Sequence, residues 1–201
     1  MRSKEPLGRT EMGYIGNAER LIEMLKPTSE KLDANAAVVV LLRATNQDFQ
    51  VLFVKRAEKT GDPWSGQTTL PGGKRNPEDQ NLKETVVRET LEETSINLFE
   101  GCRFLGAMEP VRSTQKPEMK ILPFVALLEK KQAIKLNEEL TEYFWTPLKE
   151  LAKHKGTVKF SFGEYPAYII ENHIIWGLTY KILQNLLSLI SSIKKEKPRE
   201  D

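Results

Sequence analysis

Cysteine is almost absent from this chain, which has a single one, Cys102, among 201 residues. One cysteine excludes a disulfide within the chain and a cysteine-rich zinc site, and scarce cysteine is typical of a reducing compartment. Histidine is scarce as well, with two residues, and neither lies near Cys102 in the sequence. We therefore expect a cytoplasmic protein in which Cys102 is a packed or half-exposed thiol rather than a nucleophile.

An excess of charge of one sign is also lacking, because 30 lysines and arginines nearly balance 28 aspartates and glutamates, for a net charge of +2. This balance gives no electrostatic case for a nucleic acid or an acidic membrane as partner. The first ten residues are charged and lack the apolar core of a signal peptide. The one long apolar stretch, residues 174–193, is interrupted by Lys181, Gln184 and Asn185. It predicts an amphipathic helix docked on the core rather than a membrane span.

What remains is the pattern of one globular domain, with 39% hydrophobic and 29% charged residues and no internal repeat. In the predicted strand at 121–128, Pro123 indicates either an edge strand or the first part of the strand. The apolar pattern predicts strands at 36–42, 49–55, 103–108 and 121–128, a turn at 45–48 and a short helix at 17–25. We expect an N-terminal extension (1–35), a main domain that includes the C-terminal helix (36–193) and a charged tail (194–201).

The most informative stretch, residues 70–98, joins a tight glycine loop to a helix. The loop L-P-G-G ends an apolar run, and a polar turn follows at 76–79. Asn81 is a good N-cap and Glu84 stands at the third helical position, as in a capping box. The helix is predicted over 82–94. Its predicted core face consists of Leu82, Val86, Val87, Thr90 and Leu91.

A second face of this helix is acidic, because Glu89, Glu92 and Glu93 stand at i, i+3 and i+4. Like charges at this spacing destabilise an isolated helix by a few tenths of a kcal/mol per pair, and Arg88 offsets part of that through Glu92. Clustered carboxylate oxygens are the ligands that hard divalent cations prefer. Taken alone, R-E-x-x-E-E is more often a solvated acidic face, but the glycine loop upstream favours a metal site.

Together these residues resemble the Nudix box, G-x5-E-x7-R-E-U-x-E-E-x-G-U, in which U is an aliphatic residue. Gly73, Arg88 and Ile96 match the pattern, as do the three glutamates. Asp79 replaces the first glutamate, the spacer from it to Arg88 is one residue longer, and Ser95 replaces the closing glycine. The longer P-G-G-x-x-x-P-x-D opening resembles the coenzyme A diphosphatase branch of the family. So do the G-Q pair at 66–67 and the segment 174–179.

The resemblance implies an α/β/α sandwich on a mixed sheet and a hydrolase that cleaves a diphosphate linkage with Mg2+, or Mn2+, as cofactor. Arg88 would orient a ligand glutamate, and Asp79 would be structural or lie in the outer shell. Glu89 and Glu139 both remain open as the general base. The implicated residues are Arg88, Glu89, Glu92 and Glu93 for catalysis and Gly72, Glu89, Glu92 and Glu93 for the metal.

The substrate implied is a nucleoside diphosphate derivative, with coenzyme A or an acyl derivative first. The alternatives are an ADP-ribose, NADH or dinucleotide pyrophosphohydrolase and, in another class, a Nudix module that binds nucleotides without catalysis. Arg56 is a candidate for binding a phosphate, although a basic residue at a strand end is more often solvated. Trp64 either stacks on a base or serves as a core or lid aromatic. The expected partner is a small nucleotide, without nucleic acid or membrane, and a homodimer is left open.

Overall fold

The computed structural model describes residues 18–29, 32–45, 49–61, 64–113 and 116–195. Its centre is an eight-stranded sheet. The strands are β1 (Ala36–Ala44), β2 (Phe49–Arg56), β3 (Thr68–Thr69), β4 (Gly72–Lys74), β5 (Cys102–Ala107), β6 (Val111–Arg112), β7 (Lys120–Leu128) and β8 (Leu140–Pro147). The order is β3-β2-β1-β7-β5, with β4, β6 and β8 paired to β1, β7 and β2. The sheet is mixed, because β1 and β7 run parallel while the β1–β2 and β5–β7 pairs are antiparallel.

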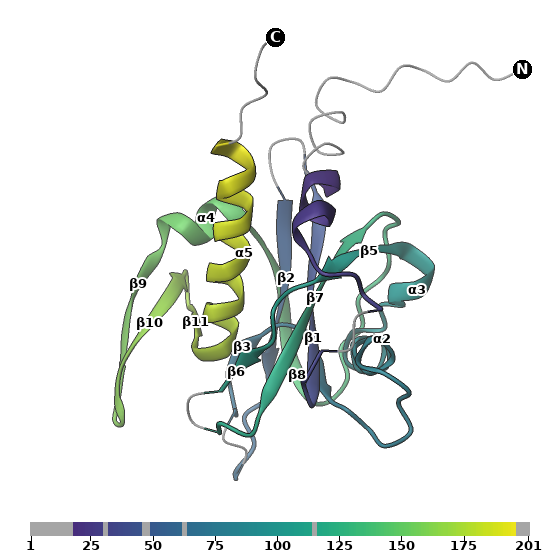
Figure 1. The fold of residues 1–201 in the computed structure, drawn as a ribbon. Coiled ribbons are helices and arrows are strands. Elements are labelled where there is room, and N and C mark those ends of the chain that lie inside the picture. Colours follow the sequence, from purple (N-terminus) through teal and green to yellow (C-terminus); the bar gives the residue numbers. More distant parts are fainter. Residues whose placement is uncertain (1–17, 30–31, 46–48, 62–63, 114–115, 196–201) are drawn as a thin grey trace, which may run out of the picture.

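Helices cover both faces of this sheet, as Figure 1 shows for α2 and α5. They are α2 (Leu82–Thr94), α3 (Leu98–Gly101), α4 (Leu148–Lys153) and α5 (Gly177–Lys195). Alternate residues of β1 pack on opposite sides, with Val39 and Leu41 in the cluster beneath α2 and Val40 and Leu42 in the cluster beneath α5. A strand buried on both faces needs an unbroken apolar run, as β1 has. Because helices cover both faces of a mixed sheet, the predicted α/β/α sandwich is confirmed.

A second sheet of three strands was not predicted. It consists of β9 (Lys155–Phe160), β10 (Gly163–Ile170) and β11 (His173–Trp176), in the order β11-β10-β9. The β9–β10 hairpin stands beside α5 and away from the main sheet (Figure 1). This sheet corrects the predicted start of the C-terminal helix. Residues 174–176 belong to β11, and the helix begins at Gly177, whose φ of 61° breaks the strand.

His173, just before the stretch that was predicted to be helical, is a buried strand residue rather than a helix cap or a surface residue. The residue lies in β11 and is 6% exposed. Its Nε2 atom lies 3.0 Å from Oε1 of Glu142 in β8, and its ring stacks on Phe144 with centroids 3.8 Å apart. The histidine therefore joins the second sheet to the main one.

The prediction from Pro123 was also wrong, because β7 is an interior strand and Pro123 lies within it. The Pro123 carbonyl accepts a hydrogen bond from the Met108 N–H at 2.8 Å. The absent N–H of the proline faces the same side, between the end of β5 at Ala107 and the start of β6 at Val111. No ladder partner is required in that gap, so an interior proline is tolerated there.

The other predicted strands are confirmed to within two residues at their ends, and a helix covers 18–24. Residue 17, most of the turn at 45–48, the first ten residues and the tail from 196 onward lie outside the described residues. The C-terminal helix is confirmed from Gly177 onward. Among the described helices, none combines the length and apolar character needed to cross a membrane.

Candidate active site

Two glycines bring β4 against both the main sheet and α2. Gly72 has a φ of +136°, and a Cβ there would lie 2.2 Å from the Ala37 carbonyl oxygen. A Cβ on Gly73 would lie 2.4 Å from Oε2 of Glu89. A larger residue at position 72 would therefore collide with backbone, and one at position 73 would collide with the side chain of Glu89.

Helix α2 has the predicted bounds, and its caps explain why. The Asn81 side chain accepts a hydrogen bond from the Glu84 N–H, and the Glu84 carboxylate accepts one from the Gln80 N–H at 2.8 Å. In an ordinary capping box the N–H of the N-cap residue donates to this glutamate; here the N–H of Gln80, one residue before the N-cap, does so. Ser95 closes the helix in the left-handed region, with φ of 61°, as its place in the box predicts.

The core face of α2 differs from the prediction at one residue. Leu91 was expected to be buried, but it is 44% exposed, whereas Glu93 is 4% exposed. The reason is the glycine loop, which covers Glu93 and leaves Leu91 outside. Leu82, Val86, Val87 and Thr90 are buried as predicted.

Arg88 holds together the acidic residues on either side of it. Its guanidinium donates to both carboxylate oxygens of Asp79 at 3.0 Å, to Glu89 at 2.8 Å and to Glu92 at 3.2 Å. Asp79 is 7% exposed and accepts two further bonds, from the Thr85 hydroxyl and the Asn76 N–H. Its hydrogen bonds with Arg88 hold the pKa of Asp79 well below its usual range.

A pocket of about 390 Å³, called here the acidic pocket, lies where α2, β4 and the start of β8 meet. Its acidic end is lined by Arg56, Gly72, Gly73, Glu89, Glu93 and Glu139. Glu93 lies at its base, where Oε2 accepts the Gly72 N–H at 2.9 Å. The side chains of Glu89 and Glu93 therefore face the same space as Glu139.

Burial dominates the electrostatics of this end. It raises the pKa of Glu93 to about 8; the hydrogen bond from Gly72 and the charge of Arg56 oppose this, and the charges of Glu89 and Glu139 add to it. Burial also raises the pKa of Glu89. Carboxylates buried together in this way are stabilised by a cation among them.

Glu92 lies elsewhere. Its side chain is 55% exposed, it pairs with Arg88, and it does not line the acidic pocket. Arg88 does not line the pocket either and contacts it through Glu89. Of the predicted site residues, the structure brings together Gly72, Glu89 and Glu93, with Arg88 and Glu92 on the outer side of the helix.

Both candidate substrate-binding residues line the acidic pocket. Arg56 ends β2, and its charge acts on Glu93. Trp64 is half-buried, and the Lys116 amine lies 4.4 Å from its ring centroid. Lys120, another basic residue after the box, pairs with Asp33 and does not line the pocket.

The opposite wall of the acidic pocket was missed in the sequence. Tyr165 of β10, Trp176 of β11 and Leu178, Lys181 and Ile182 of α5 form it. The alternation of aromatic and polar residues over 158–168 is a strand signal that would have located the hairpin. The position of the hairpin over the pocket depends on pairing between distant segments, and a local alternation of residues does not predict such pairing.

With this geometry in view, comparison with known proteins defines the class. The NUDIX domain model matches residues 33–166, so the chain belongs to the Nudix family and is a diphosphohydrolase of that family. The mitochondrial coenzyme A diphosphatase NUDT8 of Homo sapiens is 30% identical over 166 residues, covering 79% of this chain and 70% of the relative. The uncharacterized Nudix hydrolase NudL of Yersinia enterocolitica is 25% identical, covering 92% and 95%.

Solved structures show the same fold. The Nudix hydrolase RenU of M. Smegmatis matches with a TM-score of 0.57 and 15% identity, over 82% of this chain and 89% of that one. The MutT/nudix family protein from Enterococcus faecalis gives 0.52 and 18%, over 92% and 70%. At these identities the likeness establishes the fold alone.

Nudix enzymes typically use a divalent metal, and the donor set here fits one. The pocket offers carboxylate oxygens from Glu89, Glu93 and Glu139, which suit a hard cation rather than a soft one. Among the residues that the structure describes, no three acidic, histidine or cysteine side chains already form a compact metal site. Glu89, which lines the same pocket, is also paired with Arg88.

Proposed function

We propose that this protein is a Mg2+-dependent hydrolase of the diphosphate linkage in coenzyme A or an acyl derivative of it. The observation that carries the proposal is the acidic pocket, in which the buried carboxylate of Glu93 faces one space with Glu89, Glu139 and Arg56 beside a glycine loop. The choice of coenzyme A is supported by the relative named as a coenzyme A diphosphatase. Cleavage would yield 3′,5′-ADP and a phosphopantetheine.

The roles of the residues follow from their positions. Glu93, fixed by the Gly72 N–H, and Glu89, oriented by Arg88, would hold the cation. A bound Mg2+ supplies positive charge that offsets the phosphates and polarises the phosphorus. Arg56 adds a positive charge at the same end and would bind a phosphate oxygen.

Hydrolysis also requires a base that removes a proton from the attacking water. Glu89 and Glu139 both line the pocket, so either carboxylate would accept that proton at one of its oxygens. Trp64, which also lines the pocket, would cover the bound substrate. Because the pocket takes residues from Ala36 to Ile182, it supports a hydrolase domain over residues 36–193.

The test is product analysis over a small panel with Mg2+: coenzyme A, acetyl-coenzyme A, ADP-ribose, NADH and a dinucleoside polyphosphate. We expect 3′,5′-ADP to form fastest, turnover to stop with EDTA, and Mg2+ or Mn2+ to restore it. If ADP-ribose or NADH is hydrolysed fastest, the coenzyme A assignment is wrong. Turnover that continues in EDTA would contradict the metal role.

A further inference from the structure

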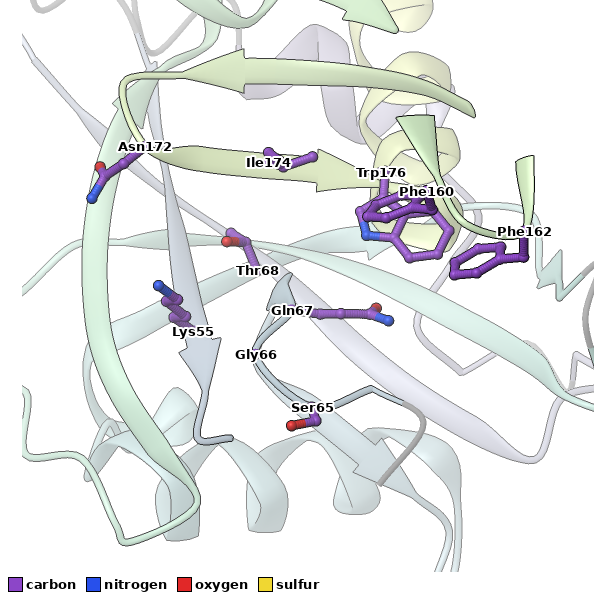
Figure 2. A pocket seen from close by; sticks show the side chains of 10 residues that line it. All are labelled: Lys55, Ser65, Gly66, Gln67, Thr68, Phe160, Phe162, Asn172, Ile174 and Trp176. Atoms are coloured by element: carbon purple, nitrogen blue, oxygen red, sulfur yellow. The ribbon is translucent and has the colours of Figure 1, made fainter. Parts of the chain in front are cut away.

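A second hollow adjoins the acidic pocket and has no part in the chemistry described so far. It has a volume of about 450 Å³ and lies between β2, the segment before β3 and the second sheet (Figure 2). We call it the aromatic hollow. Six of its lining residues carry the argument: Lys55, Gln67, Phe160, Phe162, Asn172 and Trp176.

One end of the aromatic hollow is a cluster of rings. Phe160 and Phe162 stack nearly parallel, with centroids 5.1 Å apart and an angle of 6°, and Trp176 lies 4.5 Å from Phe160. Phe162 is 57% exposed. An exposed, flat aromatic face beside an active site is suited to stacking on a planar base. Such stacking works with any nucleobase, because every base has a flat π-face.

The other end of the hollow is polar. Figure 2 shows Lys55 and Asn172 away from the three rings, with Gln67 extended between the two ends. None of the ion pairs among the described residues involves the Lys55 amine. Glu142, the residue opposite Lys55 in β8, pairs with His173 instead. A lysine that forms no ion pair at the end of a hollow is suited to a phosphate group.

The hollow adjoins the acidic pocket, because Gln67 and Trp176 line both. A ligand that fills both spaces would place a diphosphate near Glu93, a base on the rings and a further anion near Lys55. Those three features together describe a nucleoside diphosphate that carries an additional phosphate on its ribose.

We infer that the aromatic hollow binds the 3′-phosphoadenosine end of the substrate, with the base stacked on Phe160, Phe162 and Trp176 and the 3′-phosphate at Lys55. This inference rests on the proposed function, since it takes coenzyme A as the substrate. It assigns to Lys55 the discrimination between coenzyme A and dephospho-coenzyme A, which lacks the 3′-phosphate.

The test compares kcat/KM for coenzyme A and dephospho-coenzyme A in the wild type, Lys55→Met and Phe162→Ala. Lys159→Met is the matched control, because Lys159 is exposed on β9 and does not line the hollow. We expect the wild type to prefer coenzyme A by about tenfold, as one charge-assisted contact provides. Lys55→Met should abolish that preference by lowering only the coenzyme A value. Phe162→Ala should lower both values by about tenfold, and Lys159→Met should change neither.

The inference is overturned if Lys55→Met keeps the preference or if Phe162→Ala leaves both values unchanged. Calorimetric titration of 3′,5′-ADP without metal separates this failure from failure of the proposed function. If coenzyme A is not hydrolysed but 3′,5′-ADP binds, and binds about tenfold more weakly to Lys55→Met, the hollow is supported and the substrate assignment fails. If 3′,5′-ADP does not bind, or binds the variant equally well, the inference is wrong.

Discussion

Replacement of Asp79 by Asn should weaken the fold and the active site together, because Asp79 fixes Arg88 and Arg88 fixes Glu89. The Asp79 carboxylate accepts four hydrogen bonds: two from Arg88 at 3.0 Å, one from Thr85 at 2.9 Å and one from Asn76 at 2.8 Å. An amide in the same place turns one acceptor into a donor that faces another donor. It also removes the charge that compensates the guanidinium.

The magnitude follows from the burial of the pair. Breaking a fully buried ion pair costs about 3–5 kcal/mol. Arg88 retains 29% exposure and keeps its contacts with Glu89 and Glu92, so we expect a loss of about 2–3 kcal/mol in the free energy of unfolding. In a chain of this size that lowers Tm by roughly 5–10 °C. Loss of an orienting partner of a metal ligand should reduce kcat by about 10–100-fold.

The assay is urea unfolding at several pH values beside steady-state kinetics, with Glu78→Gln as control. Glu78 is the exposed neighbour of Asp79, so the control removes the same charge without the Arg88 contact and should behave as the wild type. Because the pKa of Asp79 is lowered in the folded state, its stabilisation is complete above the unfolded pKa of about 3.9. The gap between wild type and Asp79→Asn should therefore be constant from pH 7 to pH 5 and shrink below about pH 4. Equal stability at pH 7, or a gap that widens as the pH falls, would refute the reasoning.

Three further substitutions and one chemical modification are predicted from local geometry. Gly72→Ala should lower the yield of folded protein on expression and lower its Tm, because the new Cβ would meet backbone atoms. Gly73→Ala should fold but lose activity, because its Cβ would displace the Glu89 carboxylate. Equal yield, Tm and activity in the two variants would contradict this contrast. Ser95→Gly should raise the free energy of unfolding by about 0.5–1 kcal/mol, since glycine adopts a φ of 61° without strain, and a lower urea midpoint would disprove it. Burial raises the pKa of Cys102 to about 11, so alkylation by iodoacetamide at pH 8 should be on the order of 100-fold slower in the native protein than in urea; comparable rates would show that the thiol is accessible and ionised.

Much of the fold could be predicted because its signals are local. The run A-A-V-V-V-L-L at 36–42 requires a strand buried on both faces, and β1 is that strand. Asn81 and Ser95 fix the two ends of α2 by hydrogen bonding and backbone conformation, which the sequence shows directly. The acidic pocket was partly predictable for the same reason, since the glycine loop and Glu93 are joined by one short turn and one helix.

The errors arose where pairing between distant segments decides the structure. Pro123 predicted an edge strand, yet β7 is interior. The strand tolerates this proline because the gap between β5 and β6 faces it. His173 is buried because β11 brings it to Glu142 of β8. The aromatic wall of β9–β11 lies over the pocket through contacts with β3 and α5 that no local periodicity encodes. Leu91 is exposed because the glycine loop covers the other side of its helix.

The most direct test of the central claim is the effect of Glu93→Gln on turnover and on stability in the same preparation. Gln keeps the shape of the side chain and an oxygen for the Gly72 N–H. It removes the carboxylate that a cation would ionise and bind, from a position that is 4% exposed and close to Glu89. We predict a loss of at least about 100-fold in Mg2+-dependent hydrolysis of coenzyme A, with a Tm equal to or above that of the wild type. Glu93→Gln enzyme that turns over at the wild-type rate would contradict the claim that this pocket is the catalytic site.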